Sequence, residues 1–158
     1  MNPHSSPSTE LASRPGDARP PNPLHVYLAG VGAVGSALLR QIESLDRDRH
    51  ALQLLGACTS RRSTWTVSGL SPGRIPTRLS EGAPLDWPSI VDRLTQDAPR
   101  PLVFVDATGS PVVADFYEAL LQAGIHVVTP SKLANTRSQA VFEQLHAAAA
   151  EAGVQYRY

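Results

Sequence analysis

Short apolar segments alternate with helical patterns along most of this chain, and this alternation constrains the possible folds more than any other feature. Apolar runs predict strands at 24–29, 52–58, 102–105, 125–128 and 154–158. Apolar residues at helical spacing predict helices near 33–46, 86–97, 110–124 and 136–152. Strands joined through helices lie parallel, because each right-handed crossover returns the chain to the same edge of the sheet. The sequence therefore predicts an α/β protein with a doubly wound parallel sheet in a single domain.

Two stretches depart from this alternation. Residues 1–23 contain six of the 14 prolines. Proline removes backbone donors and blocks helix formation, so we expect a disordered leader before a folded domain at 24–158. The stretch from Thr59 to Leu85 is rich in Ser, Gly, Pro and Arg and has no sustained periodicity. This composition predicts a long loop.

The composition excludes several kinds of partner. The chain has 158 residues, of which 42% are hydrophobic, enough to form a core. Fourteen basic residues balance 14 acidic ones, whereas nucleic acids and anionic membranes bind surfaces with a basic excess. No apolar run approaches the ~20 residues of a transmembrane helix. We therefore expect neither a nucleic acid nor a membrane as a partner.

The cysteine and histidine residues indicate a reduced protein without a metal. A single cysteine, Cys58, excludes an internal disulfide and is typical of the cytoplasm. It lies on an apolar strand, where we expect it to pack as a small hydrophobic residue. His126 also lies in an apolar strand and is expected to be a hydrogen-bonded core residue. His25, His50 and His146 lack the spacing of metal ligands, so no metal site is expected.

A glycine motif lies between the first predicted strand and the first predicted helix. The pattern G-x-G-x-x-G is formed by Gly30, Val31, Gly32, Ala33, Val34 and Gly35. In such a motif the first glycine permits a tight turn, the second lets a pyrophosphate approach the backbone, and the third lets the helix pack closely. The start of the helix then offers free N–H groups to the phosphates. We expect a Rossmann-type dinucleotide site here; the alternative is a glycine-rich turn without a ligand.

The residues after the second strand favour NADP over NAD. Sites for NAD commonly carry an acidic residue there to bind the ribose hydroxyls, but no acid occurs between Asp48 and Glu81. The same interval contains five arginines: Arg49, Arg61, Arg62, Arg74 and Arg78. A guanidinium binds a 2′-phosphate well, so Ser60 and Arg61 are the best candidate contacts. The alternative is a basic loop that only faces solvent.

Two further turns are expected at the same edge of the sheet, where ligands of open α/β folds bind. Thr108 follows the third strand and is a candidate cofactor contact, whereas Asp106 is expected to anchor the turn. The fourth strand leads to Ser131 and to Lys132, the chain's only lysine. An ammonium group there can bind a substrate oxygen and transfer its proton during hydride transfer. The alternative is an ordinary exposed lysine.

Three segments together resemble the homoserine dehydrogenase family. They are residues 30–39, 103–108 and 124–135. The last is the most specific, because it is similar to the family's T-P-N-K-K-A-N signature. The resemblance is closest to the dehydrogenase part of bifunctional aspartate kinase–homoserine dehydrogenase chains, and it extends over residues 24–158.

This resemblance implies an activity and roles for individual residues. The family interconverts aspartate 4-semialdehyde and homoserine with NADP(H) or NAD(H), on the route to threonine and methionine. Lys132 matches the active-site lysine between cofactor and substrate. The glycine motif matches the pyrophosphate loop, Thr108 matches a contact on the nicotinamide side, and Ser60 and Arg61 match the loop on the adenosine side.

The sequence also departs from the family pattern. Ser131 stands where the family usually has Asn, which affects the positioning of Lys132, and Leu133 stands where a second Lys is common. In the family, a domain that binds substrate and forms a homo-oligomer follows the position of Tyr158. Hydride transfer needs both reactants held in near-attack geometry. We therefore expect this chain, alone, to bind the cofactor and to turn over little or no substrate.

Two other functions are compatible with the same residues. A stand-alone dinucleotide-binding module that senses or regulates needs no second domain, and the length of the chain favours it. A different two-domain oxidoreductase, acting on a sugar or another semialdehyde, would use the same nucleotide-binding half. The segment T-P-S-K at residues 129–132 counts against this second alternative.

Overall fold

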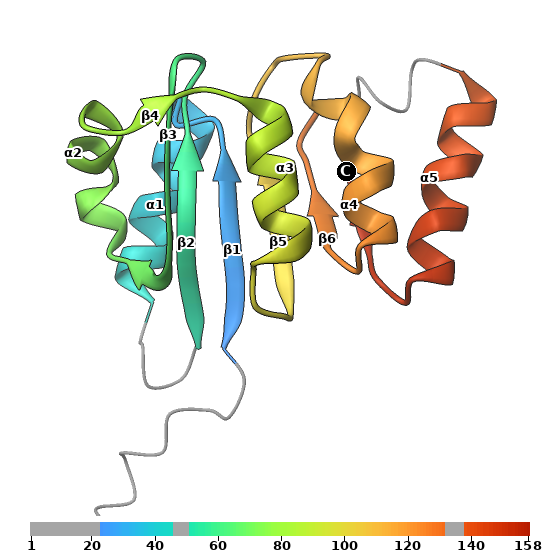
Figure 1. Ribbon diagram of the computed structural model, residues 1–158, viewed down its shortest axis with the longest axis horizontal. Coiled ribbons are helices and arrows are strands. Elements are labelled where there is room, and N and C mark those ends of the chain that lie inside the picture. Colours follow the sequence, from blue (N-terminus) through green and yellow to red (C-terminus); the bar gives the residue numbers. More distant parts are fainter. Residues whose placement is uncertain (1–22, 46–50, 132–137) are drawn as a thin grey trace, which may run out of the picture.

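One seven-stranded sheet runs through the molecule, with helices on both faces (Figure 1). The computed structural model describes residues 23–45, 51–131 and 138–158, so residues 1–22 of the predicted leader lie outside it. The strand order is β4-β3-β2-β1-β5-β6-β7. The strands are β1 (Leu24–Ala29), β2 (Leu52–Cys58), β3 (Arg62–Leu70), β4 (Ala83–Pro84), β5 (Leu102–Asp106), β6 (His126–Val128) and β7 (Tyr156–Arg157).

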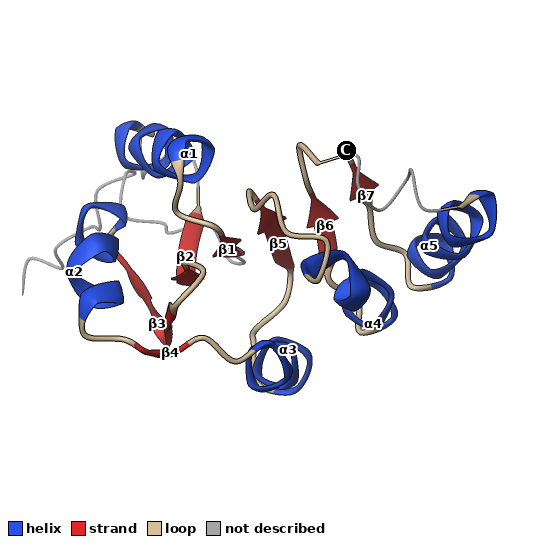
Figure 2. Ribbon diagram, turned by 90° about the horizontal axis from the view of Figure 1, so that it is seen from above, coloured by secondary structure: helices blue, strands red, loops and turns tan. Residues whose placement is uncertain are grey.

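The helices form a layer on each face of the sheet (Figure 2). They are α1 (Ala33–Ser44), α2 (Ile75–Ser80), α3 (Trp87–Gln96), α4 (Tyr117–Gln122) and α5 (Gln139–Glu151). Helices α1 and α2 pack against one face, and α3, α4 and α5 pack against the other. Within the described residues, no helix is long and apolar enough to cross a membrane.

The sheet is parallel across β2, β1, β5, β6 and β7 and antiparallel where β3 and β4 extend it. The predicted α/β class and doubly wound arrangement are therefore confirmed. Helix α3 begins after Asp86, whose carboxylate accepts a hydrogen bond from the Ser89 N–H at 3.3 Å. This residue is the predicted cap of that helix.

The prediction of a loop from Thr59 to Leu85 is wrong. This stretch forms β3, a 3₁₀ turn at Pro72–Arg74, α2 and β4. Strand β3 is the second strand from one end of the sheet, next to the short edge strand β4, and Thr64 is its only buried residue. A strand that is little buried needs no continuous apolar run, so polar residues surround Trp65 and Val67 in its sequence. The apolar pattern that marks the interior strands is absent for that reason.

The helix predicted from Ser110 begins later. Residues Val113–Phe116 form a 3₁₀ turn, and α4 follows it. Ser110 caps no helix; its N–H donates to Thr108 Oγ1 at 3.2 Å. The chain therefore completes a hydrogen-bonded turn after β5 before helical structure starts.

Aromatic rings form the centre of the larger core, between the sheet and α3–α5. The Phe104 ring lies in the middle of β5, with its centroid 6.0 Å from that of Tyr27 and 6.4 Å from that of Trp87. Tyr27 in turn contacts Trp65 at 6.1 Å between ring centroids. These contacts join β1, β3, β5 and α3, and so fix the position of α3 against the sheet.

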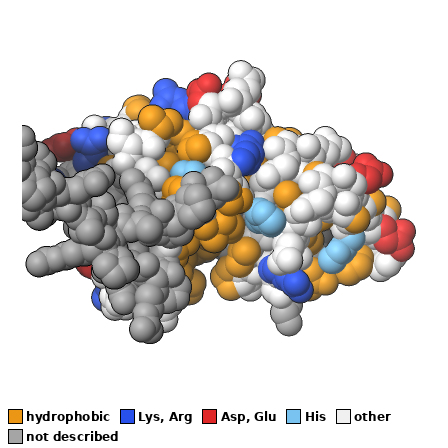
Figure 3. Space-filling model, turned by 90° about the horizontal axis from the view of Figure 1, so that it is seen from below, with side chains coloured by type: hydrophobic (Ala, Val, Ile, Leu, Met, Phe, Trp, Pro, Cys, Tyr) orange, Lys and Arg blue, Asp and Glu red, His pale blue; other side chains and the backbone are white. Residues whose placement is uncertain are grey.

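The face seen from below shows hydrophobic side chains near its middle, with charged side chains of both signs spread around them (Figure 3). No large patch of one charge is visible outside the grey residues. This distribution agrees with the equal numbers of acidic and basic residues in the sequence.

A buried carboxylate fixes the turn at the end of β5. Asp106 is 1% exposed, and its Oδ1 accepts a hydrogen bond from the Thr108 N–H at 2.7 Å. Its Oδ2 accepts from the Tyr117 hydroxyl at 2.5 Å. Burial, together with this hydrogen bond, raises the pKa of Tyr117 far above its usual range, so Tyr117 remains the donor. Asp106 is thus an anchor for the turn, as the sequence predicts.

Replacing Tyr117 by Phe should destabilise the fold. The Tyr117→Phe variant removes a donor from a buried carboxylate, and such bonds contribute ~1.5–3 kcal/mol. We expect the free energy of unfolding, measured in urea at pH 7, to fall by about that amount. The matched control is Tyr158→Phe, since Tyr158 is half-exposed at 52%; it should change stability by less than ~0.5 kcal/mol. Equal effects of the two variants would contradict this account.

Candidate functional site

A cavity of about 480 Å³ opens at the carboxyl edge of the parallel strands, at the top of the sheet in Figure 1. Cavities of roughly 300–1,000 Å³ hold most small-molecule ligands and cofactors. The register explains its position, because Ala29 of β1 pairs with both Cys58 of β2 and Asp106 of β5. The three strands end side by side. The lining residues are Gly30, Val31, Gly32, Thr59, Ser60, Leu85, Trp87, Ala107, Thr108, Gly109, Ser110 and Val113.

Two glycines of the G-x-G-x-x-G motif are required by the fold itself. Gly30 has φ +92°, a conformation that favours glycine, and a Cβ there would lie 2.9 Å from the carbonyl of Ala107. Gly35 is buried in α1, and a Cβ there would lie 2.0 Å from the carbonyl oxygen of Gly30. The chain therefore needs glycine at both positions to bring the start of α1 against the end of β1.

Gly32 is different, because no contact among the described residues requires glycine there. Its φ is −90°, and a Cβ added there would meet no atom within 4 Å. The missing side chain leaves open space in the cavity, directly at the N-cap position of α1. This space fits a group that approaches the backbone closely, as the pyrophosphate of a dinucleotide does.

The start of α1 is suited to bind such an anion. The helix is 12 residues long, its N-cap makes no side-chain hydrogen bond, and its first turn contains no acidic residue. The first N–H groups of a helix have no intrahelical partner and carry the positive end of the helix dipole. Ala33 and Val34 are exposed in this first turn. Their amides, with those of Gly32 and Gly35, lie at the end of α1 that favours an anion.

The two arginines in and after the turn that follows β2, Arg61 and Arg62, have side chains in different environments. Thr59 Oγ1 accepts hydrogen bonds from the N–H groups of Arg61 and Arg62, at 3.3 and 3.1 Å. The Arg62 guanidinium donates to the carbonyl oxygen of Gly82 at 2.7 Å and so ties β3 to the turn before β4. The Arg61 side chain is exposed and has no hydrogen-bond or ion-pair partner in the described parts of the chain. Arg61 follows Ser60, which lines the cavity.

The turns after β5 and β6 complete the edge. Thr108 lines the cavity, and its Oγ1 accepts from Ser110 N–H, so its hydroxyl hydrogen remains available to a ligand. After β6, the buried Thr129 accepts from the Ser131 N–H through Oγ1 at 3.0 Å. Ser131 lies at the same edge but does not line this cavity. The predicted catalytic residue, Lys132, lies outside the described residues.

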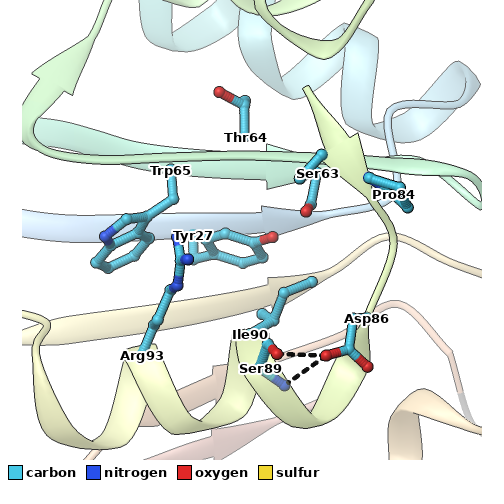
Figure 4. A pocket seen from close by; sticks show the side chains of 10 residues that line it. Tyr27, Ser63, Thr64, Trp65, Pro84, Asp86, Ser89, Ile90 and Arg93 are labelled. Atoms are coloured by element: carbon cyan, nitrogen blue, oxygen red, sulfur yellow. Dashed lines mark hydrogen bonds between the residues drawn. The ribbon is translucent and has the colours of Figure 1, made fainter. Parts of the chain in front are cut away.

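Three large apolar residues of the cavity are missing from the sequence prediction: Leu85, Trp87 and Val113. Leu85 lies between β4 and α3, at the end of the predicted loop, and Trp87 is the first residue of α3, within the predicted helix. The Leu85 N–H donates to the carbonyl oxygen of Arg61 at 2.8 Å, which brings this segment to the edge of the sheet. The sequence does contain a signal for Leu85 and Trp87, because these two apolar residues flank Asp86, the residue that caps α3 (Figure 4).

Histidine, cysteine and acidic residues form no metal site in the described ranges, where no group of three lies close enough together. The Cys58 thiol is fully buried at the end of β2, and burial raises its pKa to about 11. It therefore stays a neutral thiol at physiological pH and packs as the predicted hydrophobic residue. His126 is half-buried, and its Nδ1 accepts from the Gln155 N–H at 3.1 Å.

Comparison with known proteins identifies the family. Residues 30–158 match the sequence model described as "Homoserine dehydrogenase, NAD binding domain". The homoserine dehydrogenase of Emericella nidulans is 30% identical over 141 residues, which cover 82% of this chain and 37% of that protein. The bifunctional aspartokinase/homoserine dehydrogenase of Haemophilus influenzae is 30% identical over 125 residues, covering 76% of this chain and 15% of that protein. The chain thus spans well under half the length of these relatives.

Solved structures share the fold. The homoserine dehydrogenase of Thermoplasma acidophilum superposes with a TM-score of 0.67 at 24% identity, covering 87% of this chain and 43% of that one. A hyperthermophilic archaeal homoserine dehydrogenase in complex with NADPH gives a TM-score of 0.68 at 19% identity, covering 85% and 43%. The resemblance seen in the sequence is therefore confirmed. This chain belongs to the homoserine dehydrogenase family and corresponds to its NAD-binding domain.

Proposed function

We propose that this chain is the nucleotide-binding part of a homoserine dehydrogenase that reduces aspartate 4-semialdehyde to homoserine with NADPH, for threonine and methionine synthesis. The open space above Gly32 carries the proposal. Neither the backbone angle nor any neighbouring atom requires glycine there, whereas a pyrophosphate needs that space to reach the amides of α1. The family match supports the choice of reaction.

Each turn at the carboxyl edge has its own task in this proposal. The backbone of residues 30–35 holds the pyrophosphate. Ser60 and Arg61 bind the adenosine end, and Thr108 binds the nicotinamide end. Ser131 continues the turn that leads to Lys132. When bound, the nicotinamide supplies the hydride; the protein positions it and excludes water with the apolar wall around Trp87.

The free arginine after β2 supports NADP rather than NAD as the cofactor. The Arg61 guanidinium is available beside Ser60, and a guanidinium pairs well with a phosphate. Arg62 already binds the Gly82 carbonyl. No acidic residue occurs from residue 49 to residue 80 to repel a 2′-phosphate.

We assign the proton transfer to Lys132. It is the chain's only lysine and comes directly after Ser131 in the sequence. Its ammonium group can give a proton to the carbonyl oxygen of the substrate and recover it in the reverse reaction, which an arginine cannot do. The substrate must also be held in near-attack geometry. In the family this requires a second domain, so we expect the 158-residue chain alone to bind cofactor without turnover.

Substituting Gly32 should remove cofactor binding and leave the fold intact. In Gly32→Ala, the added Cβ occupies the space for the pyrophosphate and meets no atom of the described part of the chain. We expect the affinity for NADPH, measured by calorimetry, to fall about tenfold or more, while stability changes by less than ~0.5 kcal/mol. The control Gly35→Ala should lose about 3 kcal/mol, because its Cβ overlaps the Gly30 carbonyl. Unchanged NADPH affinity in Gly32→Ala would contradict the proposal.

Substituting Arg61 should change the cofactor preference. A hydrogen bond to a charged group contributes ~1.5–3 kcal/mol, equal to a factor of roughly 10–100 in affinity. Arg61→Ala should weaken NADPH binding by that factor and leave NADH binding unchanged. The control is Arg78→Ala, which removes the same charge from an exposed position on α2. An equal loss in both variants would show that the effect is only one of net charge.

The role of Lys132 can be tested in a chimera. Residues 24–158 would replace the nucleotide-binding region of the Emericella nidulans enzyme, and reduction of NADP⁺ by homoserine would be followed by absorbance. Lys132→Met should lower kcat by roughly 10²–10⁴-fold and leave the NADPH affinity unchanged. Lys132→Arg should be equally inactive, because it keeps the charge but cannot release a proton. Substantial activity in either variant would exclude Lys132 as the proton donor.

A further inference from the structure

Two buried side chains at the carboxyl edge, Asp106 and Thr129, form the same kind of turn on neighbouring strands. Strands β5 and β6 are parallel and paired in register up to the residues that precede these two. Each side chain then accepts a hydrogen bond from the N–H two residues later, Asp106 from Thr108 at 2.7 Å and Thr129 from Ser131 at 3.0 Å. Such local bonds are a common way for Asp and Thr to fix a turn. The two strands therefore end side by side in similar turns.

Tyr117, the first residue of α4, joins these two turns. It is buried, with its ring centroid 5.9 Å from that of Tyr156. Its hydroxyl donates to Asp106 Oδ2 at 2.5 Å, and its oxygen is also hydrogen-bonded to the Thr129 side chain. Burial and the bond to Asp106 raise the pKa of Tyr117, whereas Thr129 acts in the opposite direction, as a donor to the phenol oxygen does. The Thr129 hydroxyl is therefore the donor in its bond to Tyr117.

The hydrogen bonds of this chain all point the same way. The Ser131 N–H donates to Thr129, whose hydroxyl donates to Tyr117. Tyr117 donates in turn to Asp106, which also holds the Thr108 N–H. A hydroxyl has only one hydrogen, so each of the two hydroxyls donates once and accepts once. Aligned hydrogen bonds in a buried environment strengthen one another, so removing either hydroxyl weakens the bonds on both sides of it.

The chain of bonds connects two parts of the proposed cofactor site. Thr108 lines the cavity and is the proposed contact to the nicotinamide end, and Ser131 belongs to the neighbouring turn. A ligand is bound more tightly when the groups around it are already held in the bound geometry. We propose that Tyr117 and Thr129 are positioning residues, which lock the turn after β5 to the turn after β6 and so hold the nicotinamide end of the site in its binding geometry. The role towards nicotinamide rests on the proposed function, whereas the link between the turns does not.

The link between the turns can be measured in the 158-residue chain without a nucleotide. Thr129→Val replaces the hydroxyl by a methyl group of similar size, so the Ser131 N–H loses its acceptor. We expect hydrogen exchange of the Ser131 amide, followed in ¹H–¹⁵N spectra, to become about tenfold faster, and the Thr108 amide resonance in the other turn to shift. Tyr117→Phe breaks the link from the other side and should shift the Ser131 resonance.

The matched control is Thr129→Ser, which loses a methyl group and keeps the hydroxyl. It should retain the wild-type resonances of both turns, whereas a role of Thr129 in packing alone would make the Ser variant differ from the wild type more than the Val variant does. A Thr108 resonance that does not respond to Thr129→Val, together with a Ser131 resonance that does not respond to Tyr117→Phe, would show that the turns are independent and would overturn the proposal.

The positioning role is tested with two nucleotides that differ only in the nicotinamide. 2′-Phospho-ADP-ribose has the adenosine end and the pyrophosphate of NADPH but no nicotinamide ring. In calorimetry with the 158-residue chain, we expect Thr129→Val to bind NADPH about tenfold more weakly and 2′-phospho-ADP-ribose as the wild type does. Thr129→Ser should bind both as the wild type does.

The remaining outcomes separate this inference from the proposed function. An equal loss for both nucleotides in Thr129→Val would indicate general damage to the fold, and unchanged NADPH affinity would show that the link does not position the nicotinamide; either result overturns the positioning role. If the wild-type chain bound neither nucleotide, the proposed function would be wrong and the positioning role with it. The amide resonances would still show whether the two turns are linked.

Discussion

The in-register pairing of β1 with β2 and β5 is the constraint on which the rest of the structure depends. Ala29 pairs with Cys58 on one side and with Asp106 on the other, so three strands end at one level. The backbone fixes this level further, because the Gly30 N–H donates to the Cys58 carbonyl at 2.9 Å and the Ala107 N–H donates to the Ala29 carbonyl at 2.7 Å. Three turns that are distant in sequence are thereby held around one cavity.

The interior of the fold could be predicted because its strands are buried on both faces and joined through helices. Such strands leave long apolar runs in the sequence, and the helices between them keep the helical period. Strands β3 and β4 lack both signals, since β3 is mostly polar and β4 has only two residues. Strand β3 is stabilised by pairing with β2, and β4 by pairing with β3 and by the bond from Arg62 to Gly82. Tertiary contacts of this kind leave no periodic pattern.

Parts of the candidate site could be predicted for a similar reason. A glycine motif between a strand and a helix has a fixed place in the fold, so its position relative to the sheet follows from the sequence. The difference between Arg61 and Arg62 does not, because only the structure shows which guanidinium is already bound. Tyr27 is another case. In the sequence it is one member of an apolar strand, and the burial of its hydroxyl oxygen emerges only from the packing around it.

Gly32 and Gly35 lie three residues apart and are subject to different kinds of selection. A side chain at 35 collides with the protein's own backbone, whereas a Cβ at 32 meets no atom within 4 Å in the described parts of the chain. Any descendant of this domain that folds must keep glycine at 35. A descendant that lost its ligand would be free to change residue 32. Under the proposed cofactor binding, residue 35 therefore records the inheritance of the fold across diverging lineages, and residue 32 records whether the ligand has been retained.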